Sequence, residues 1–95
     1  MAKYKHMNAT IQFGSRIVPI YNAEIEKEPG GLAEGVGAFD IDGQGFPAGE
    51  SKGLITIGGE SPEGSRRYCF YPRGQLHLPG TPQRTRIFGR VYASA

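Results

Sequence analysis

Turn-forming residues interrupt this chain at short intervals, and their spacing is the feature that most constrains its fold. The 95 residues include 15 glycines and seven prolines, most of them in the stretches FGS, EPGG, DGQG, GGESPEGS, PRG and LPGTP. No window of about eleven residues shows apolar residues at helical spacing without an interrupting glycine or proline. The chain therefore predicts short strands joined by turns, within a single domain.

The segments between the turns alternate apolar and polar residues, which is typical of strands. Short strands at this spacing predict an all-β domain, a small antiparallel β-barrel or sandwich spanning residues 1–95. Pro19 lies inside one strand and fits there only at an edge or a bulge. The predicted strands lie near residues 4–13, 16–26, 33–41, 52–58, 66–72, 75–78 and 84–93.

The C-terminal strand has two chemically different faces. Because successive side chains of a strand point to opposite sides, residues 84–93 divide into two alternating sets. The first set is small and apolar and suits a core: Thr85, Ile87, Gly89, Val91 and Ala93. The second is cationic and aromatic, and a soluble monomer gains little by displaying it: Arg84, Arg86, Phe88, Arg90 and Tyr92.

The stretch SRRYCFYPRG, residues 65–74, combines arginines and rings in the same way. Alternation places Arg66, Tyr68 and Phe70 on one face. The other face carries Arg67, Cys69, Tyr71 and Arg73. If this strand lies close to the C-terminal one, up to six arginines flank several rings.

The net charge of +2 is small, but the charges are segregated along the chain. Residues 24–63 carry all nine acidic residues and only two lysines, whereas residues 64–95 carry six arginines and no acid. Three explanations stay open: an anionic partner for the C-terminal third, an acidic surface on a neighbouring subunit, or strands that pair and neutralise each other within one chain.

Single-stranded nucleic acid is the partner that best fits the C-terminal third. Such ligands are held by a cationic groove along the backbone and by aromatic rings that stack on bases. Because some of the rings must form the core, not all of them are available. The candidate phosphate contacts are Arg66, Arg67, Arg73, Arg84, Arg86 and Arg90, and the candidate stacking rings are Tyr68, Phe70, Phe88 and Tyr92.

Self-assembly is the alternative, because arginine and aromatic residues are also enriched at protein–protein interfaces. A virion or decoration protein, a subunit of an oligomeric scaffold, or an inhibitor bound to a protein partner would use the same face. Hydrophobic residues make up only 38% of the chain, and so lean a core favours a homo-oligomer.

Other chemistry finds little support in the sequence. DIDGQG at 40–45 begins like a calcium loop, but Ser51 stands where a bidentate glutamate is needed. His6, Cys69 and His77 are too few and too scattered for a zinc site. Cys69 and His77 could act as a nucleophile and base only if their strands adjoin. We therefore expect no enzyme activity, no cofactor and no metal.

The expected location is the cytoplasm or a virion. The single cysteine cannot form an internal disulfide, so nothing indicates an oxidising compartment. The first ten residues contain no apolar run, so we expect no signal peptide. No stretch approaches the roughly 20 apolar residues of a membrane span, so we expect no membrane partner.

Overall fold

The computed structural model describes residues 2–4, 9–27, 34–43, 45–58, 65–80 and 83–93. In these ranges the regular secondary structure consists of β-strands, without a helix. The all-β prediction is confirmed. In these ranges no helix is long and apolar enough to cross a membrane. The strands are β1 (Ala2–Tyr4), β2 (Ala9–Phe13), β3 (Arg16–Lys27), β4 (Glu34–Asp42), β5 (Gly53–Gly58), β6 (Ser65–His77) and β7 (Arg84–Ala93).

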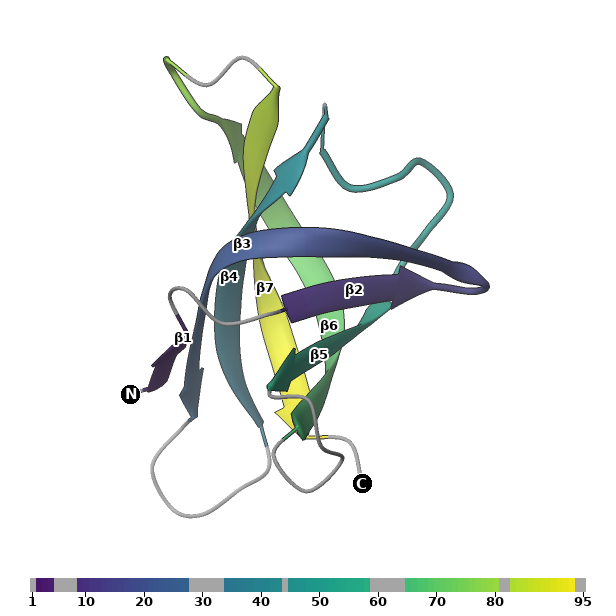
Figure 1. Cartoon of the computed structure of the whole chain (residues 1–95), viewed down its shortest axis with the longest axis vertical. Helices are drawn as coiled ribbons and strands as arrows, with labels where there is room; N and C mark the ends of the chain where they lie inside the picture. Colours follow the sequence, from purple (N-terminus) through teal and green to yellow (C-terminus); the bar gives the residue numbers. More distant parts are fainter. Residues whose placement is uncertain are drawn as a thin grey trace.

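Six of these strands close into an antiparallel barrel, which decides between the two predicted architectures. The order around the barrel is β3-β2-β5-β6-β7-β4, and a β4–β3 pairing completes the circle (Figure 1). Strand β1 pairs with the second half of β3, outside this circle. Closure removes the free sheet edges that a small protein has few other ways to protect.

Two strands differ from their predicted limits. The predicted strands 66–72 and 75–78 are one strand, β6, because the residues between them form a bulge against β7 between Pro72 and Gly74 and no turn. A bulge absorbs an extra residue without ending the pairing. Of the predicted strand 4–13, the two ends belong to β1 and β2, and residues 5–8 lie outside the described ranges.

Strand β3 bends as it passes from one neighbour to the next. Pro19 faces Thr10 of β2, and among described residues the pairing with β4 starts only at Ile20, so Pro19 has the predicted edge position. A bulge follows between Tyr21 and Glu24. Asn22 lies within it at a φ of 53°, a left-handed conformation that asparagine adopts more readily than most residues.

The core fills the barrel with the inward side chains of every barrel strand. Ile11, Ile55, Ile57, Phe70 and Ile87 are all at most 1% exposed. Fully burying a side chain of this size contributes about 1.5–3 kcal/mol to folding. The apolar face predicted for the C-terminal strand points inward from Thr85 to Val91, which confirms that part of the interpretation.

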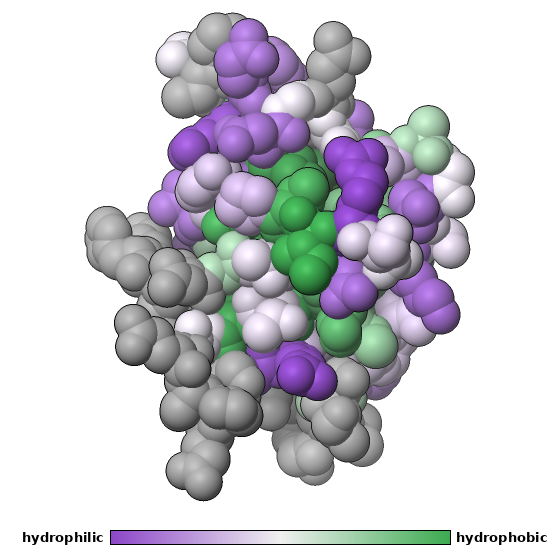
Figure 2. Space-filling view, turned by 45° about the vertical axis from the view of Figure 1, so that its right-hand side comes forward, coloured by the Kyte–Doolittle hydropathy of each residue, from purple (hydrophilic) through white to green (hydrophobic). Residues whose placement is uncertain are grey.

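Some apolar side chains remain on the outside. The space-filling view shows apolar atoms open to the surface within a mostly hydrophilic face (Figure 2). Single exposed apolar residues are normal, but several on adjoining strands indicate a contact surface. The large exposed apolar and aromatic residues are Ile17, Val36, Tyr71, Leu76, Phe88 and Tyr92.

Candidate functional site

Strand β4 carries acidic residues on the same outward face on which β7 carries its arginines. In the β4–β7 register, Asp40 lies opposite Arg86 and Asp42 lies opposite Arg84. The acidic middle and the basic C-terminal third of the sequence therefore meet within one chain. Neutralisation between paired strands, one of the three explanations for the charge segregation, applies to this part of the barrel.

Arg86 is bound by three groups of its own chain. Its Nη1 donates to Asp40 Oδ1 at 2.7 Å and to the Asn22 carbonyl oxygen at 3.5 Å, and its Nη2 lies 3.4 Å from Glu24 Oε2. Asp40 is 5% exposed and also accepts a bond from Asn22 Nδ2 at 2.9 Å. A buried carboxylate is tolerated only when it is paired in this way. Arg86 therefore stabilises the bulge in β3.

Arg84 has a more exposed set of partners. Its Nε lies 3.2 Å from Asp42 Oδ1, and its guanidinium carbon lies 3.8 Å from the centre of the Tyr21 ring. The Tyr21 hydroxyl donates to Asp42 Oδ2 at 3.2 Å. A phosphate would compete with Asp42 for Arg84, and with Asp40 and Glu24 for Arg86. These two predicted phosphate contacts have carboxylate partners already.

The predicted stacking rings divide between the core and the surface. Tyr68 and Phe70 are 4% and 0% exposed and point into the barrel, so neither presents a face to a surface ligand. Both rings lie on the inward face of β6 and belong to the core, as the sequence requires of some of the candidate rings. Phe88 and Tyr92, on the outward face of β7, are 40% and 39% exposed.

The arginines of β6 differ from Arg84 and Arg86. Arg66, Arg67 and Arg73 are exposed, and none forms an ion pair with another described residue. Strands β2, β5 and β6 contain no acidic residue. This side of the barrel therefore keeps a cationic surface that β4 does not neutralise.

Four side chains of β6 and β7 line a hollow of about 370 Å³ next to this surface: Tyr71, Arg73, Arg90 and Tyr92, together called the Arg–Tyr hollow. Tyr71 lies opposite Arg90 in the β6–β7 register. The Tyr71 and Tyr92 rings meet edge to face, with centroids 5.4 Å apart and planes at 83°. Arg90 also lies 3.8 Å from Glu34, a long and partly exposed ion pair.

The hollow combines two guanidinium groups with two aromatic rings on one outward surface. Guanidinium groups donate paired hydrogen bonds to phosphate oxygens and also stack on flat rings. Tyrosine rings offer apolar faces to bases. This set of side chains can hold a ligand that has both an anionic group and a flat ring.

Tyr71 was absent from the predicted site. The alternation of side chains along β6 indicates its position. Tyr71 shares a face with Arg67 and Arg73 and lies on the face opposite to Tyr68 and Phe70. Once the latter two rings are assigned to the core, Tyr71 must point outward. Arg73, Arg90 and Tyr92 were predicted, and the fold brings these three together with Tyr71.

The suggested cysteine–histidine pair does not form. Cys69 and His77 lie on the same strand, eight residues apart. In extended backbone this separation is about 26 Å, so the two side chains cannot exchange a proton directly. Cys69 is half-buried beside Tyr92 in the register with β7, and not in the core.

Comparisons of the chain with protein-family models, with curated proteins and with solved structures find no match. No relative therefore lends a ligand or an activity to the Arg–Tyr hollow. The inference of function rests on the side chains of the hollow and on the charge around them.

Proposed function

We propose that this protein is a non-enzymatic binding protein that engages a polyanion, single-stranded nucleic acid above all, through the Arg–Tyr hollow and the neighbouring arginines of β6. The observation that carries the proposal is the grouping of two arginines and two half-exposed tyrosines on one outward surface. The cytoplasmic or virion-associated location predicted from the sequence belongs to this proposal.

The spacing of the groups supports a strand-like ligand. Arg67 and Arg73 are six residues apart on β6, which corresponds to roughly 20 Å of extended backbone. A ligand that contacts both therefore runs across Tyr71 and the hollow. Stacking on an aromatic side chain contributes about 1–3 kcal/mol per base and tolerates any sequence.

The footprint is smaller than six arginines would allow. Arg84 and Arg86 are engaged by carboxylates, and Arg66 shares the alternating face of β6 that Tyr68 and Phe70 turn inward. Arg67 and Arg73 remain, together with Arg90, for which a phosphate competes with Glu34. For single strands the logarithm of the binding constant falls by about 0.7 per phosphate neutralised as the logarithm of salt rises. Three contacts predict a slope of about −2.

Fluorescence anisotropy with labelled oligo-dT and an unstructured RNA tests the proposal. We expect roughly micromolar binding at about 50 mM salt that weakens with a slope between about −2 and −3. Arg73→Gln should weaken it about tenfold, because a charged hydrogen bond to the ligand is lost. Arg84→Gln removes the same charge outside the hollow and serves as the matched control, with a loss below about threefold.

Two results would refute the proposal. One is the absence of binding at low salt, where release of counterions favours association most. The other is an equal loss of affinity in R73Q and R84Q, which would mean that only net charge matters.

Self-association is the second candidate, and one observation favours it. Val36 and Phe88, beside the hollow on β4 and β7, are 46% and 40% exposed although both are apolar. A polyanion gives these side chains nothing to pack against.

A further inference from the structure

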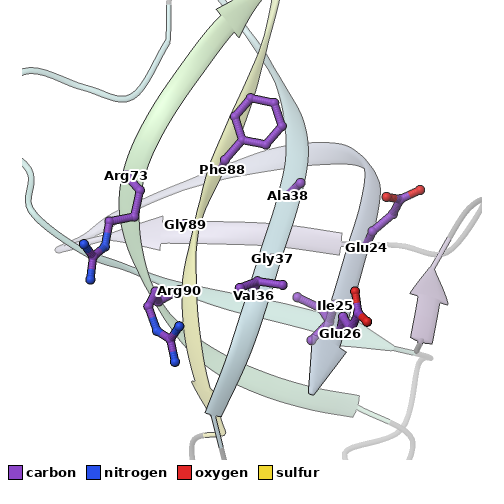
Figure 3. Close-up of a pocket in the computed structure, with 10 residues that line it drawn as sticks. All are labelled: Glu24, Ile25, Glu26, Val36, Gly37, Ala38, Arg73, Phe88, Gly89 and Arg90. Carbon is purple, nitrogen blue, oxygen red and sulfur yellow. The ribbon is translucent and has the colours of Figure 1, made fainter. Parts of the chain in front are cut away.

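A groove of about 660 Å³ crosses the outer side of four neighbouring strands, β6, β7, β4 and β3. Its floor is apolar, and Gly37 and Gly89 face each other there across the β4–β7 register. Val36, Ala38 and Phe88 stand beside them (Figure 3). The groove adjoins the Arg–Tyr hollow and shares Arg73 and Arg90 with it.

The two walls of the groove carry opposite charges. Glu24 and Glu26 of β3 line one side, and Arg73 and Arg90 line the opposite side, with the apolar floor between them (Figure 3). The arginines belong to β6 and β7 and the glutamates to β3. The barrel order β6-β7-β4-β3 therefore puts positive charge on one side of the groove and negative charge on the other.

Glu26 and Arg73 are the more exposed charge of each wall, and each lacks an ion pair with any other described residue. Glu24 is held by Arg86 at 3.4 Å, and Arg90 lies 3.8 Å from Glu34. Glu26 and Arg73 are both exposed. They remain the charges most available to a partner.

We propose that a second copy of this chain docks on this groove in a twofold-symmetric dimer. The twofold axis lies in the interface and runs along the boundary between β7 and β4. Rotation about it places the basic wall of each copy against the acidic wall of the other copy. Arg73 then meets the partner's Glu26 twice, once on each side of the axis. Val36 and Phe88 pack against the same residues of the second copy at the centre.

Charge complementarity selects a second copy over other occupants. A polyanion would be repelled by the Glu24 and Glu26 wall, and a basic partner would be repelled by Arg73 and Arg90. A matching partner must place positive charge against the Glu24 and Glu26 wall and negative charge against the Arg73 and Arg90 wall. A second copy of this chain, turned about the twofold axis, does both. The resulting interface has apolar residues in the middle and charged residues at the rim, as stable interfaces do.

This inference develops the second candidate, self-association, and does not rest on polyanion binding. Dimerisation and polyanion binding share Arg73 and Arg90, so each would compete with the other for them. Glu26 belongs to the groove alone. Replacing it therefore separates the two activities.

The test is sedimentation velocity of the full chain, without nucleic acid, over a concentration range from about 1 μM to about 1 mM, which covers weak interfaces. We expect a concentration-dependent dimer for the wild-type protein. R73E and E26R should each weaken the dimer at least tenfold, because each brings two like-charged contacts to the interface. The matched controls are R16E and E50R, which make the same charge changes at exposed positions outside the groove.

Mixing the two single variants gives the sharpest result. In a heterodimer of R73E with E26R, each of the two contacts between positions 73 and 26 again joins a positive and a negative charge. An equimolar mixture of the two variants should therefore form a heterodimer, although each variant alone dimerises weakly. Recovery of the dimer also shows that both variants fold. E26R alone should keep the affinity for oligo-dT, if the chain binds it, because the hollow is intact.

Three outcomes would overturn the dimer: a wild-type monomer at every concentration, a dimer that R73E and E26R weaken no more than their controls, or a mixture that fails to associate. None of them depends on nucleic-acid binding. Conversely, a dimer without any affinity for oligo-dT would support this inference and contradict the proposed function.

Discussion

Asp40 shows how one buried carboxylate decides the role of an arginine. The two oxygens of Asp40 accept bonds from Arg86 and Asn22, which ties β7 to the bulge of β3. Arg84 and Asp42 form a similar pair one step further along the same strands, but their side chains are 35% and 56% exposed. Two arginines that are equivalent in the sequence therefore contribute differently to stability.

Arg86→Gln should destabilise the protein by about 2–4 kcal/mol, because it leaves the Asp40 carboxylate buried without its cation. Arg84→Gln is the control, and its exposed pair predicts a loss of at most about 1 kcal/mol. Urea unfolding followed by circular dichroism measures both. Equal losses in the two variants would show that Asp40 does not need Arg86.

At the scale of the strands, the pairing of β6 with β7 depends on a glycine. A Cβ at Gly89 would collide with the Tyr71 carbonyl oxygen and lie 2.7 Å from Phe70 Cζ. Real Cβ atoms do not approach backbone so closely, so only glycine lets β7 press against β6 here. This close approach also holds the Tyr71 and Arg90 side chains next to each other in the hollow.

Gly89→Ala should lower the stability by about 1–3 kcal/mol, the usual cost of adding a methyl group to a packed site. Gly74→Ala on the facing strand is the control, since its Cβ would meet no atom within 4 Å. Thermal unfolding of the two variants compares them directly. A G89A protein as stable as G74A would mean that β6 and β7 can separate at no cost.

The strands were largely predictable because their signals are local. Glycine and proline turns mark most strand ends, and alternation separates Ile87 and Val91 from Arg86 and Arg90. Strand neighbours were not predictable, because pairing depends on residues far apart in the sequence. The contacts of Arg86 with Asp40 and Glu24, and the core position of Phe70, follow from barrel closure and carry no local signature.

For the whole molecule, barrel closure converts charge segregation along the chain into two surfaces. Strands β3 and β4 neutralise Arg84 and Arg86 of β7, whereas β6 keeps exposed arginines beside the Arg–Tyr hollow. The groove lies where these two regions meet, which explains why its walls have opposite signs. A polyanion and a second copy of the chain would thus bind the same side of the barrel. The polyanion needs the arginines alone, whereas the second copy needs both charged walls of the groove.

Mapping of the bound ligand tests the central claim, that anions bind at the Arg–Tyr hollow, most directly. In a titration of the ¹⁵N-labelled protein with oligo-dT, we predict the largest amide shift changes at residues 67–73 and 90–92. Amides near Arg84 and Arg86 should move little, because carboxylates hold those side chains. Changes centred on Arg84 and Arg86, or spread evenly over all cationic residues, would contradict the account.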